Sequence, residues 1–280
     1  MSGTLYIVAT PIGNLEDLTP RARKTLGEVD LIAAEDTRHT GRLLMSIGVK
    51  VRLMALHDHN EEEALSGVVT ALESGQSVAL VSDAGTPLVS DPGYRLVRTA
   101  HEREIPVSPI PGPSALTAAL SAAGLPTDHF AFEGFLPAKR AARRKVLASL
   151  RERTRTTVFY ESVHRVAESL GDMCEMLGDD RLAFVGRELT KLHEQCVQGT
   201  LAQLRAKVDD GTIVSKGEFV LVVRGSDETS PASSLDADRL LIELGAVLPA
   251  KEAARVSASV TGLKKNALYQ RLLELKDRKR

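Results

Sequence analysis

Residues 77–93 have the sequence SVALVSDAGTPLVSDPG, in which a short apolar run leads directly into a loop of unusual composition. The run 77–81 is continuous rather than alternating, which is typical of a strand buried on both faces of a parallel sheet. The loop 82–93 contains two glycines, two prolines and two aspartates. Glycine lets a ligand approach the backbone, proline stiffens a turn, and ligands of open α/β sheets bind beyond the carboxyl ends of strands. We therefore expect this loop to bind a ligand; the alternative is a tight strand-to-helix connection that binds nothing.

The same organisation extends through the N-terminal part of the chain. Short apolar runs alternate with helical patterns such as 62–74 and 94–103. The runs that we interpret as buried strands are 5–9, 30–34, 52–56 and 77–81. Continuous apolar strands separated by helices indicate a parallel sheet covered on both faces, so the fold class is α/β.

A second unit starts near residue 125. The run 130–136 alternates more strongly, which favours a strand in a mixed sheet, and a helix is expected over 163–177. Further strands are expected at 157–161, 182–186 and 219–223. The segment 226–234 is rich in Ser, Asp, Glu and Pro, as linkers are, and a helical pattern follows it. We divide the chain into an N-terminal α/β domain (1–122), a second α/β domain (123–225), a linker (226–234) and a small helical module (235–280).

Composition is that of a globular protein with an aliphatic core. The chain has 280 residues, 43% of them hydrophobic, no tryptophan and a formal net charge of −1. Cys174 and Cys196 form no close pair and no metal-type spacing, which favours two reduced thiols in a cytosolic protein. We see no signal peptide and no apolar run approaching the roughly 20 residues of a membrane span. A cytoplasmic protein that does not enter a membrane is therefore expected.

Similar loops follow other predicted strands. They are ATPIGNL at 9–15, AEDTR at 34–38, PIPGPSA at 109–115 and FYESVHR at 159–165. No Gly-Lys-Ser/Thr follows the loop 82–93, and the chain shows no Gly-x-Gly-x-x-Gly fingerprint there. A nucleoside triphosphate or an ordinary dinucleotide is therefore disfavoured as the ligand.

With these loops in this order, residues 4–225 resemble the tetrapyrrole methylase superfamily, which binds S-adenosylmethionine between two α/β domains. The motifs are similar to those of the branch that methylates a cytidine ribose 2'-hydroxyl in 16S rRNA. The motifs that carry the resemblance are TPIGNL (10–15), EDTR (35–38), SDAGTP (82–87), PGPS (111–114) and FYES (159–162). The helical tail resembles the helix-turn-helix-like domain often attached to this branch.

The resemblance implies that the methyl donor is held at the ends of several strands. The implied donor-binding residues are Pro11, Asp83, Gly85, Thr86, Pro87, Ser114, Ala115, Phe159 and Tyr160. Further contacts are implied near 187–188 and 217–218. Superfamily members are commonly homodimers, so the resemblance also implies a dimer.

Methyl transfer from a sulfonium is an in-line displacement that needs positioning rather than a metal. A ribose hydroxyl is a weak acid, so a nearby base or polarising group would help. The candidate carboxylates are Glu35, Asp36, Asp83 and Glu161. Asp83 suits donor positioning better, which leaves Glu35, Asp36 and Glu161 as catalytic candidates. The alternative for each is a helix cap or a loop hydrogen bond.

A basic segment points to a polyanionic substrate. Residues 139–155 contain eight cations and the single acid Glu152, in a chain of near-zero net charge. The predicted RNA-binding residues are Arg38, Lys139, Arg140, Arg143, Arg144 and Arg165. For Arg38 and Arg165 the alternative is an ion pair with the candidate carboxylates. The resemblance implies that this polyanion is 16S rRNA or the 30S subunit.

Three other interpretations have less support from the sequence. His57 and His59, at i and i+2 with no third ligand nearby, make a poor metal site, so no metal is expected. A methylase of a tetrapyrrole precursor would leave the basic segment without a role. A non-enzymatic RNA-binding or assembly protein would retain only a donor-like cleft.

Overall fold

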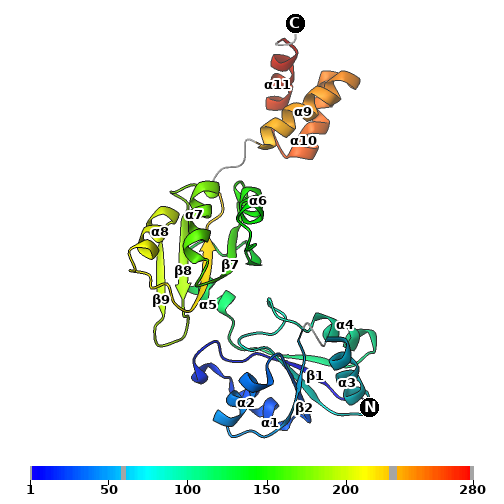
Figure 1. Cartoon of the computed structure of the whole chain (residues 1–280). Helices are drawn as coiled ribbons and strands as arrows, with labels where there is room; N and C mark the ends of the chain where they lie inside the picture. The colour runs from blue at the N-terminus through cyan, green and yellow to red at the C-terminus, as the bar shows by residue number, and fades with distance from the viewer. Residues whose placement is uncertain (1, 58–60, 227–231, 278–280) are drawn as a thin grey trace. The chain divides into compact units, whose positions relative to one another are not determined.

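The computed structural model describes residues 2–57, 61–226 and 232–277 (Figure 1). The chain divides into two compact units. The first unit consists of Met1–Ala148 and Arg155–Arg224 and contains two β-sheets. The second consists of Ser149–Thr154 and Gly225–Arg280.

The first sheet of the larger unit is wholly parallel, with the strand order β3-β2-β4-β1-β5. Its strands are β1 (Leu5–Val8), β2 (Leu31–Ala34), β3 (Arg52–Ala55), β4 (Val78–Val81) and β5 (Val107–Ile110). Its helices are α1 (Pro20–Glu28), α2 (Thr37–Ser46), α3 (Glu61–Glu73) and α4 (Tyr94–Glu102), with a 3-10 turn, η1, at Leu15–Asp17. α1 and α2 cover one face and α3 and α4 the other (Figure 1). The predicted parallel sheet with helices on both faces is confirmed.

The strand order places a topological switch point between β1 and β4. From β1 the chain crosses to β2 on one side, whereas from β4 it crosses to β5 on the other side. Because the connections after two adjacent parallel strands diverge, a crevice opens at their carboxyl ends. Two of the predicted ligand loops, 9–15 and 82–93, border this crevice.

The second sheet is mixed, with the strand order β6-β7-β10-β8-β9. β6 and β7 are parallel, and the remaining pairs are antiparallel. The strands are β6 (Phe130–Phe135), β7 (Thr156–Ser162), β8 (Leu182–Arg187), β9 (Gln195–Thr200) and β10 (Glu218–Val223). The helices are α5 (Ala115–Ala122), α6 (Arg140–Leu150), α7 (Val166–Leu177) and α8 (Leu201–Asp209). α5 packs Ala119 and Leu120 against Val158 and Val220 of this sheet, so it connects the two sheets of the unit.

Two strands were missed by the sequence prediction, and both lie at sheet edges. β5 has the sequence VSPI, in which Pro109 lacks a backbone N–H and is tolerated at an edge. β9 has the sequence QCVQGT, whose exposed positions dilute the apolar signal. β3 and β6 also lie at sheet edges, but they were predicted because their runs LMAL (53–56) and FAFEGF (130–135) are richer in apolar residues and contain no proline.

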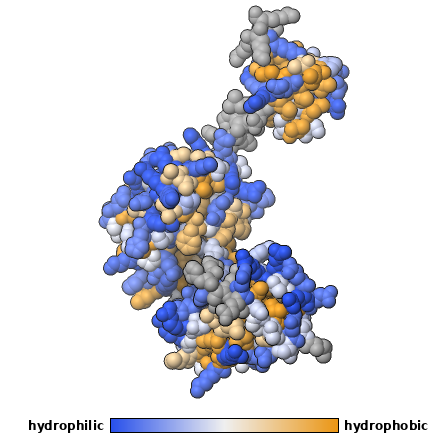
Figure 2. Space-filling view, turned by 45° about the vertical axis from the view of Figure 1, so that its right-hand side comes forward, coloured by the Kyte–Doolittle hydropathy of each residue, from blue (hydrophilic) through white to orange (hydrophobic). Residues whose placement is uncertain are grey.

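The second unit is a three-helix module. Its helices are α9 (Ala232–Val247), α10 (Ala250–Thr261) and α11 (Lys265–Asp277), around a core that includes Leu241, Ala253 and Leu272. α9 begins inside the range 226–234 that was predicted as a linker, because serine suits the first turn of a helix as well as a loop. Figure 2 shows hydrophobic residues on the visible surface of this module. Val247 and Val260 are among its exposed hydrophobic residues. No described helix is long and apolar enough to cross a membrane.

Candidate active site

A cavity of about 340 Å³ lies at the carboxyl end of β4 and reaches β7 and β10 of the second sheet. Its walls come from the loops after β1 and β4, from the start of α5 and from facing ends of β7 and β10. The lining residues are Ile12, Ala84, Gly85, Thr86, Val89, Asp91, Ser114, Ala115, Phe135, Tyr160, Glu161, Ser162, Val163, Gly217, Glu218, Phe219 and Val220. The walls are mainly apolar, with a few polar groups, as in small-molecule sites.

Backbone hydrogen bonds fix the floor of the cavity. Thr10 and Gly85 exchange N–H···O bonds of 2.9 and 3.0 Å, which join the loop after β1 to the loop after β4. The Thr86 hydroxyl donates to the Pro113 carbonyl at 3.1 Å, just before α5. Gly85 has φ +83°, and a Cβ there would lie 3.2 Å from the Ile12 side chain. The turn therefore requires glycine at this position.

Tyr160 forms an aromatic wall. Its ring makes edge contacts with Phe132 and Phe135, at centroid distances of 4.8 and 5.8 Å. Burial raises the pKa of its hydroxyl, although hydrogen bonds to the Leu116 backbone and the Ser114 side chain oppose this shift. The tyrosine thus ties the second sheet to the start of α5.

Three acidic residues beside the cavity, Glu35, Asp36 and Asp83, are linked by hydrogen bonds. The Asp83 N–H donates to Glu35 Oε2 at 3.3 Å, while the Asp36 N–H donates to Asp83 Oδ1 at 3.1 Å. Asp36 also caps α2 and pairs with Arg38 at 2.8 Å. The hydrogen bonds from Arg38 hold the pKa of Asp36 well below its usual range. Asp36 and Arg38 therefore form the intramolecular ion pair that was the alternative to RNA binding by Arg38.

Asp91, which the sequence pattern did not single out, lines the cavity from the far part of the loop 82–93. Burial raises the pKa of its carboxyl to about 6; the nearby charges of Glu35 and Asp83 add to the shift, and a hydrogen bond from Ser82 opposes it. The only sequence signal was its repetition of the Ser-Asp pair at 82–83. Perturbed carboxyls in clefts are typical of functional sites.

Glu161 is buried and heavily engaged. It accepts hydrogen bonds from the Ser169 hydroxyl at 2.6 Å and from the Ser162 N–H at 2.8 Å. Arg165 lies 3.4 Å from it and donates as well to the Leu136 carbonyl. These contacts suit a carboxylate that positions the end of β7.

The predicted donor-binding residues fall into three groups. Those that line the cavity are Gly85, Thr86, Ser114, Ala115 and Tyr160. Pro11 and Asp83 instead line a neighbouring cavity of about 310 Å³, together with His39 and Arg42. Pro87 is buried within its loop, and Phe159 is fully buried. The contacts implied near 217–218 do line the larger cavity, through Gly217 and Glu218.

The basic helix α6 is largely neutralised by α7. Arg140 pairs with Asp172 at 2.9 Å and with Glu175 at 3.0 Å, and Arg144 also pairs with Glu175. Arg143 is 1% exposed and donates to Asp172 at 2.7 Å. The structure thus places Arg143 in the interior, because α6 docks on α7 through this pair, and its guanidinium is not accessible to a phosphate.

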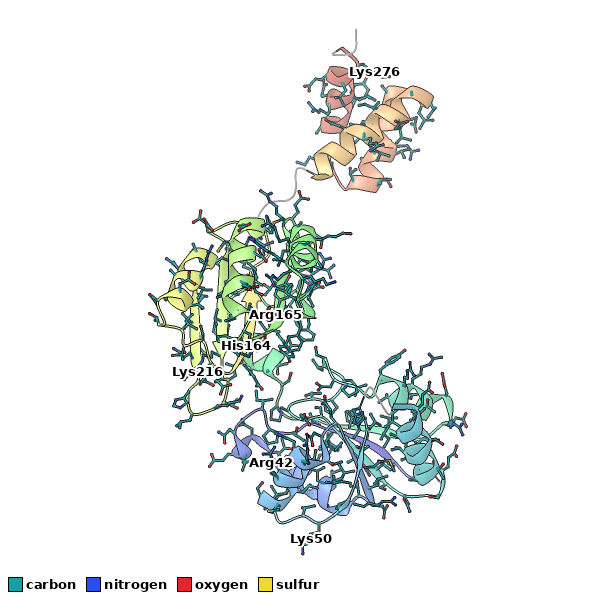
Figure 3. All side chains as sticks on the ribbon, viewed as in Figure 1. Arg42, Lys50, His164, Arg165, Lys216 and Lys276 are labelled. Carbon is teal, nitrogen blue, oxygen red and sulfur yellow. The ribbon has the colours of Figure 1, made fainter. Side chains whose placement is uncertain are left out.

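Four other basic side chains are exposed. His164 follows β7, and Lys216 precedes β10; these strand ends are adjacent, since Ser162 pairs with Glu218 (Figure 3). Arg42 on α2 lines the neighbouring cavity. Lys139 is exposed at the start of α6. Within the part of the chain that the structure describes, no carboxylate pairs with any of these four side chains.

The described residues 2–57, 61–226 and 232–277 contain no group of His, Cys, Asp or Glu side chains that could hold a metal ion. Of the sequence HDHN, Asp58, His59 and Asn60 lie outside the described residues.

Known proteins similar to this chain cover nearly all of it. Residues 4–205 match the family of Tetrapyrrole (Corrin/Porphyrin) Methylases, and residues 231–276 match the RsmI C-terminal HTH domain. The Ribosomal RNA small subunit methyltransferase I of Escherichia coli O157:H7 is 52% identical over 272 residues, covering 97% of this chain and 95% of that protein. The protein of the same name from Pseudomonas aeruginosa is 50% identical, with 98% of each chain covered.

A solved structure shows the same fold. The uroporphyrin-III-C-methyltransferase of Thermus thermophilus matches with a TM-score of 0.57 at 20% identity, over 79% of this chain and 94% of that one. At this identity the match concerns the fold alone.

Proposed function

Because this chain belongs to the tetrapyrrole methylase family, in the ribosomal RNA small subunit methyltransferase I branch, we propose that it methylates a cytidine ribose 2'-hydroxyl of 16S rRNA. S-adenosylmethionine supplies the methyl group. The cavity at the switch point carries the proposal. Its walls are mainly apolar, and acidic residues lie beside it. The exposed basic side chains of His164, Lys216 and Arg42, here called the rim, lie next to this cavity and the neighbouring one.

The cavity fits the methyl donor. Its volume of about 340 Å³ lies within the range of small-molecule sites. Tyr160 and Phe135 offer aromatic faces for an adenine ring, and Gly85 lets a ligand approach the backbone. The carboxylates of Glu35 and Asp83 lie near Asp91 and give this end of the site a negative potential, which suits a positively charged sulfonium. In this proposal Gly85, Thr86, Ser114, Ala115 and Tyr160 contact the donor, while Pro11, Asp83, Pro87 and Phe159 shape the site.

The rim suits RNA. His164 and Lys216 lie beside residues that line the cavity, and Arg42 lies beside the neighbouring one. Such basic side chains bind phosphates and place the reacting nucleotide without reading its base. In this proposal Lys139 and the exposed parts of Arg38, Arg140, Arg144 and Arg165 also contact RNA, whereas Arg143 is excluded by burial.

Glu35, Asp36 and Glu161, the catalytic candidates from the sequence, act in this proposal as positioning residues. Glu35 and Asp36 tie the ends of β2 and β4 through Asp83, and Glu161 orders the end of β7 through Ser169 and Arg165. Their removal is expected to disturb the placement of donor and acceptor, on which methyl transfer depends.

Methyl incorporation tests the proposal. Purified protein, S-adenosylmethionine labelled in the methyl group and unmethylated 30S particles should yield labelled 16S rRNA whose modification maps to one ribose 2'-oxygen of a cytidine. Label in a base would reject the ribose assignment. Methylation of a tetrapyrrole precursor in place of RNA would support the tetrapyrrole alternative. Calorimetric titration that detects no donor binding would favour a non-enzymatic RNA-binding protein.

We also propose that the protein is cytoplasmic and that it works as a homodimer, the dimer being what the family resemblance implies. Light scattering should give about twice the 30.2 kDa of the chain, and a species of 30.2 kDa alone would contradict the dimer.

A further inference from the structure

Asp91 is a half-buried carboxylate of the cavity, and no cationic side chain among the described residues pairs with it. It faces Ser82 and the charges of Glu35 and Asp83 from the strand ends, and Tyr160 from β7. Glu161 and Glu218 line the same cavity, but Glu161 is paired with Arg165, and Glu218 is 80% exposed and paired with Lys191 at 3.0 Å. Asp91 therefore keeps an oxygen available to a bound ligand.

The loop that carries Asp91 has a strained backbone just before it. Leu88 and Ser90, on either side of Val89, both adopt left-handed backbone angles, with φ +70° and +71°. Gly93 has φ +116°, and a Cβ there would lie 2.8 Å from Leu80. Such strain persists only where surrounding structure imposes it, and it clusters at functional sites. The strained turn places a carboxylate, which water would otherwise solvate, at an apolar wall.

We propose that Asp91 is the catalytic base that accepts the proton of the ribose 2'-hydroxyl; this inference rests on the proposed function. The 2'-oxygen forms a bond to the methyl carbon as the carbon–sulfur bond breaks. The electron pair of that bond stays on sulfur, which becomes a neutral thioether, and the hydroxyl proton passes to an Asp91 oxygen. The proton then leaves to solvent, so the carboxylate is restored for the next turnover.

The other carboxylates are less suited to this step. Asp36 is held by Arg38, Glu161 by Arg165 and Ser169, and Asp83 lines the neighbouring cavity. Glu35 accepts the Asp83 N–H and does not line the cavity. The negative charges of Glu35 and Asp83 instead make the Asp91 oxygen a better proton acceptor. A carboxyl whose pKa lies near 6 is still ionised at neutral pH, where a base is required.

The substitution Asp91→Asn tests this role, because it keeps the shape and removes the base. With 30S particles and saturating S-adenosylmethionine, the single-turnover rate should fall by about 10²–10⁴-fold. The Kd for S-adenosylmethionine, measured by calorimetry, should stay within about threefold. The wild-type rate should rise with pH through a limb near 6, and this limb should be absent from the residual rate of Asp91→Asn. Asp180→Asn, an exposed aspartate between α7 and β8, is the matched control and should behave as the wild type.

A second readout does not depend on turnover. Carboxyl carbon NMR of the donor-free protein should show one aspartate that titrates near pH 6, and this signal should be missing in Asp91→Asn. An unchanged rate and pH profile in Asp91→Asn would overturn the inference while the wild-type methylation upholds the proposed function. A raised Kd for the donor with an unchanged rate at saturation would also overturn it, since Asp91 would then be a donor-binding group. Absence of ribose methylation by the wild type would overturn the proposed function and this inference together.

Discussion

The Arg143 guanidinium and the Asp172 carboxylate form a buried ion pair, with 2.7 Å between Nε and Oδ2 and side chains 1% and 2% exposed. Glu168, which lies at the surface, completes the contacts of Arg143 at 3.2 Å. The pair joins α6 to α7 and removes one charge of the basic segment from the surface. Arg143 therefore stabilises the fold, whereas exposed cations of the same segment, such as Lys139, remain accessible to RNA.

We expect Arg143→Ala to lower the free energy of unfolding by about 3 kcal/mol, because it leaves the buried carboxylate of Asp172 without its main partner. Arg143→Met/Asp172→Leu, which replaces both charges by apolar groups, should recover most of that loss. Urea unfolding followed by circular dichroism measures both. Lys139→Ala, an exposed control on the same segment, should change stability by less than about 0.5 kcal/mol. Weaker 30S binding by the folded double variant would show that Arg143 does contact RNA.

The rim cations should govern RNA affinity. Lys216→Ala and Arg42→Ala are each expected to weaken binding to 30S particles and to lower the slope of log K against log salt by about 1 for each phosphate that is no longer neutralised. The donor Kd should not change. Lys50→Ala is the matched control, since Lys50 precedes β3 at the opposite, amino end of the parallel sheet (Figure 3). An equal loss of affinity in Lys50→Ala would mean that charge alone, and not this rim, decides binding.

Gly85→Ala should impair donor binding beyond its effect on stability. The left-handed φ of +83° costs a non-glycine residue about 1–2 kcal/mol, and the added Cβ meets Ile12 at the cavity wall. We expect the Kd for S-adenosylmethionine to rise about tenfold, which corresponds to about 1.4 kcal/mol. Gly211→Ala has nearly the same φ, +80°, and no atom within 4 Å of its Cβ. Gly211→Ala should lose similar stability in thermal unfolding but keep the donor Kd. If Gly211→Ala also weakened donor binding, backbone strain and not the contact with Ile12 would explain the loss in Gly85→Ala.

Asp91 should make the free energy of unfolding fall as pH rises, whereas a salt-bridged carboxylate makes it rise with pH. Its folded pKa of about 6 lies above the usual aspartate value of 3.8, so the folded state binds more protons between these values. Stability is therefore expected to fall as pH rises from about 4 to about 6. The half-exposed position limits the effect to about 1 kcal/mol by solvent screening. In thermal unfolding, Asp91→Asn should flatten this dependence and be at least as stable as the wild type at pH 7.5. A lower melting temperature for Asp91→Asn at that pH would contradict the raised pKa.

Local sequence was enough to predict the central strands and the loops that follow them. Continuous apolar runs such as 77–81 can be buried on both faces only in a covered sheet, and glycine at 85 marks a turn closed to other residues. β5 and β9 escaped because Pro109 interrupts the first and polar, partly exposed positions dilute the apolar signal of the second. The start of α9 escaped because serine favours linkers and helix starts alike.

The α/β class, the parallel and mixed sheets and the strand-end loops could all be predicted from the chain alone, because they follow from burial periodicity and turn chemistry over a few residues. Packing between distant segments decides instead which charged side chains are accessible and which carboxylates lie close together. Arg143 and Lys139 look alike in the basic segment, but packing against Asp172 buries only the first. Asp91 lies 56 positions from Glu35, and its carboxyl is perturbed because the switch point between β1 and β4 brings distant loops together in a pocket of low polarity.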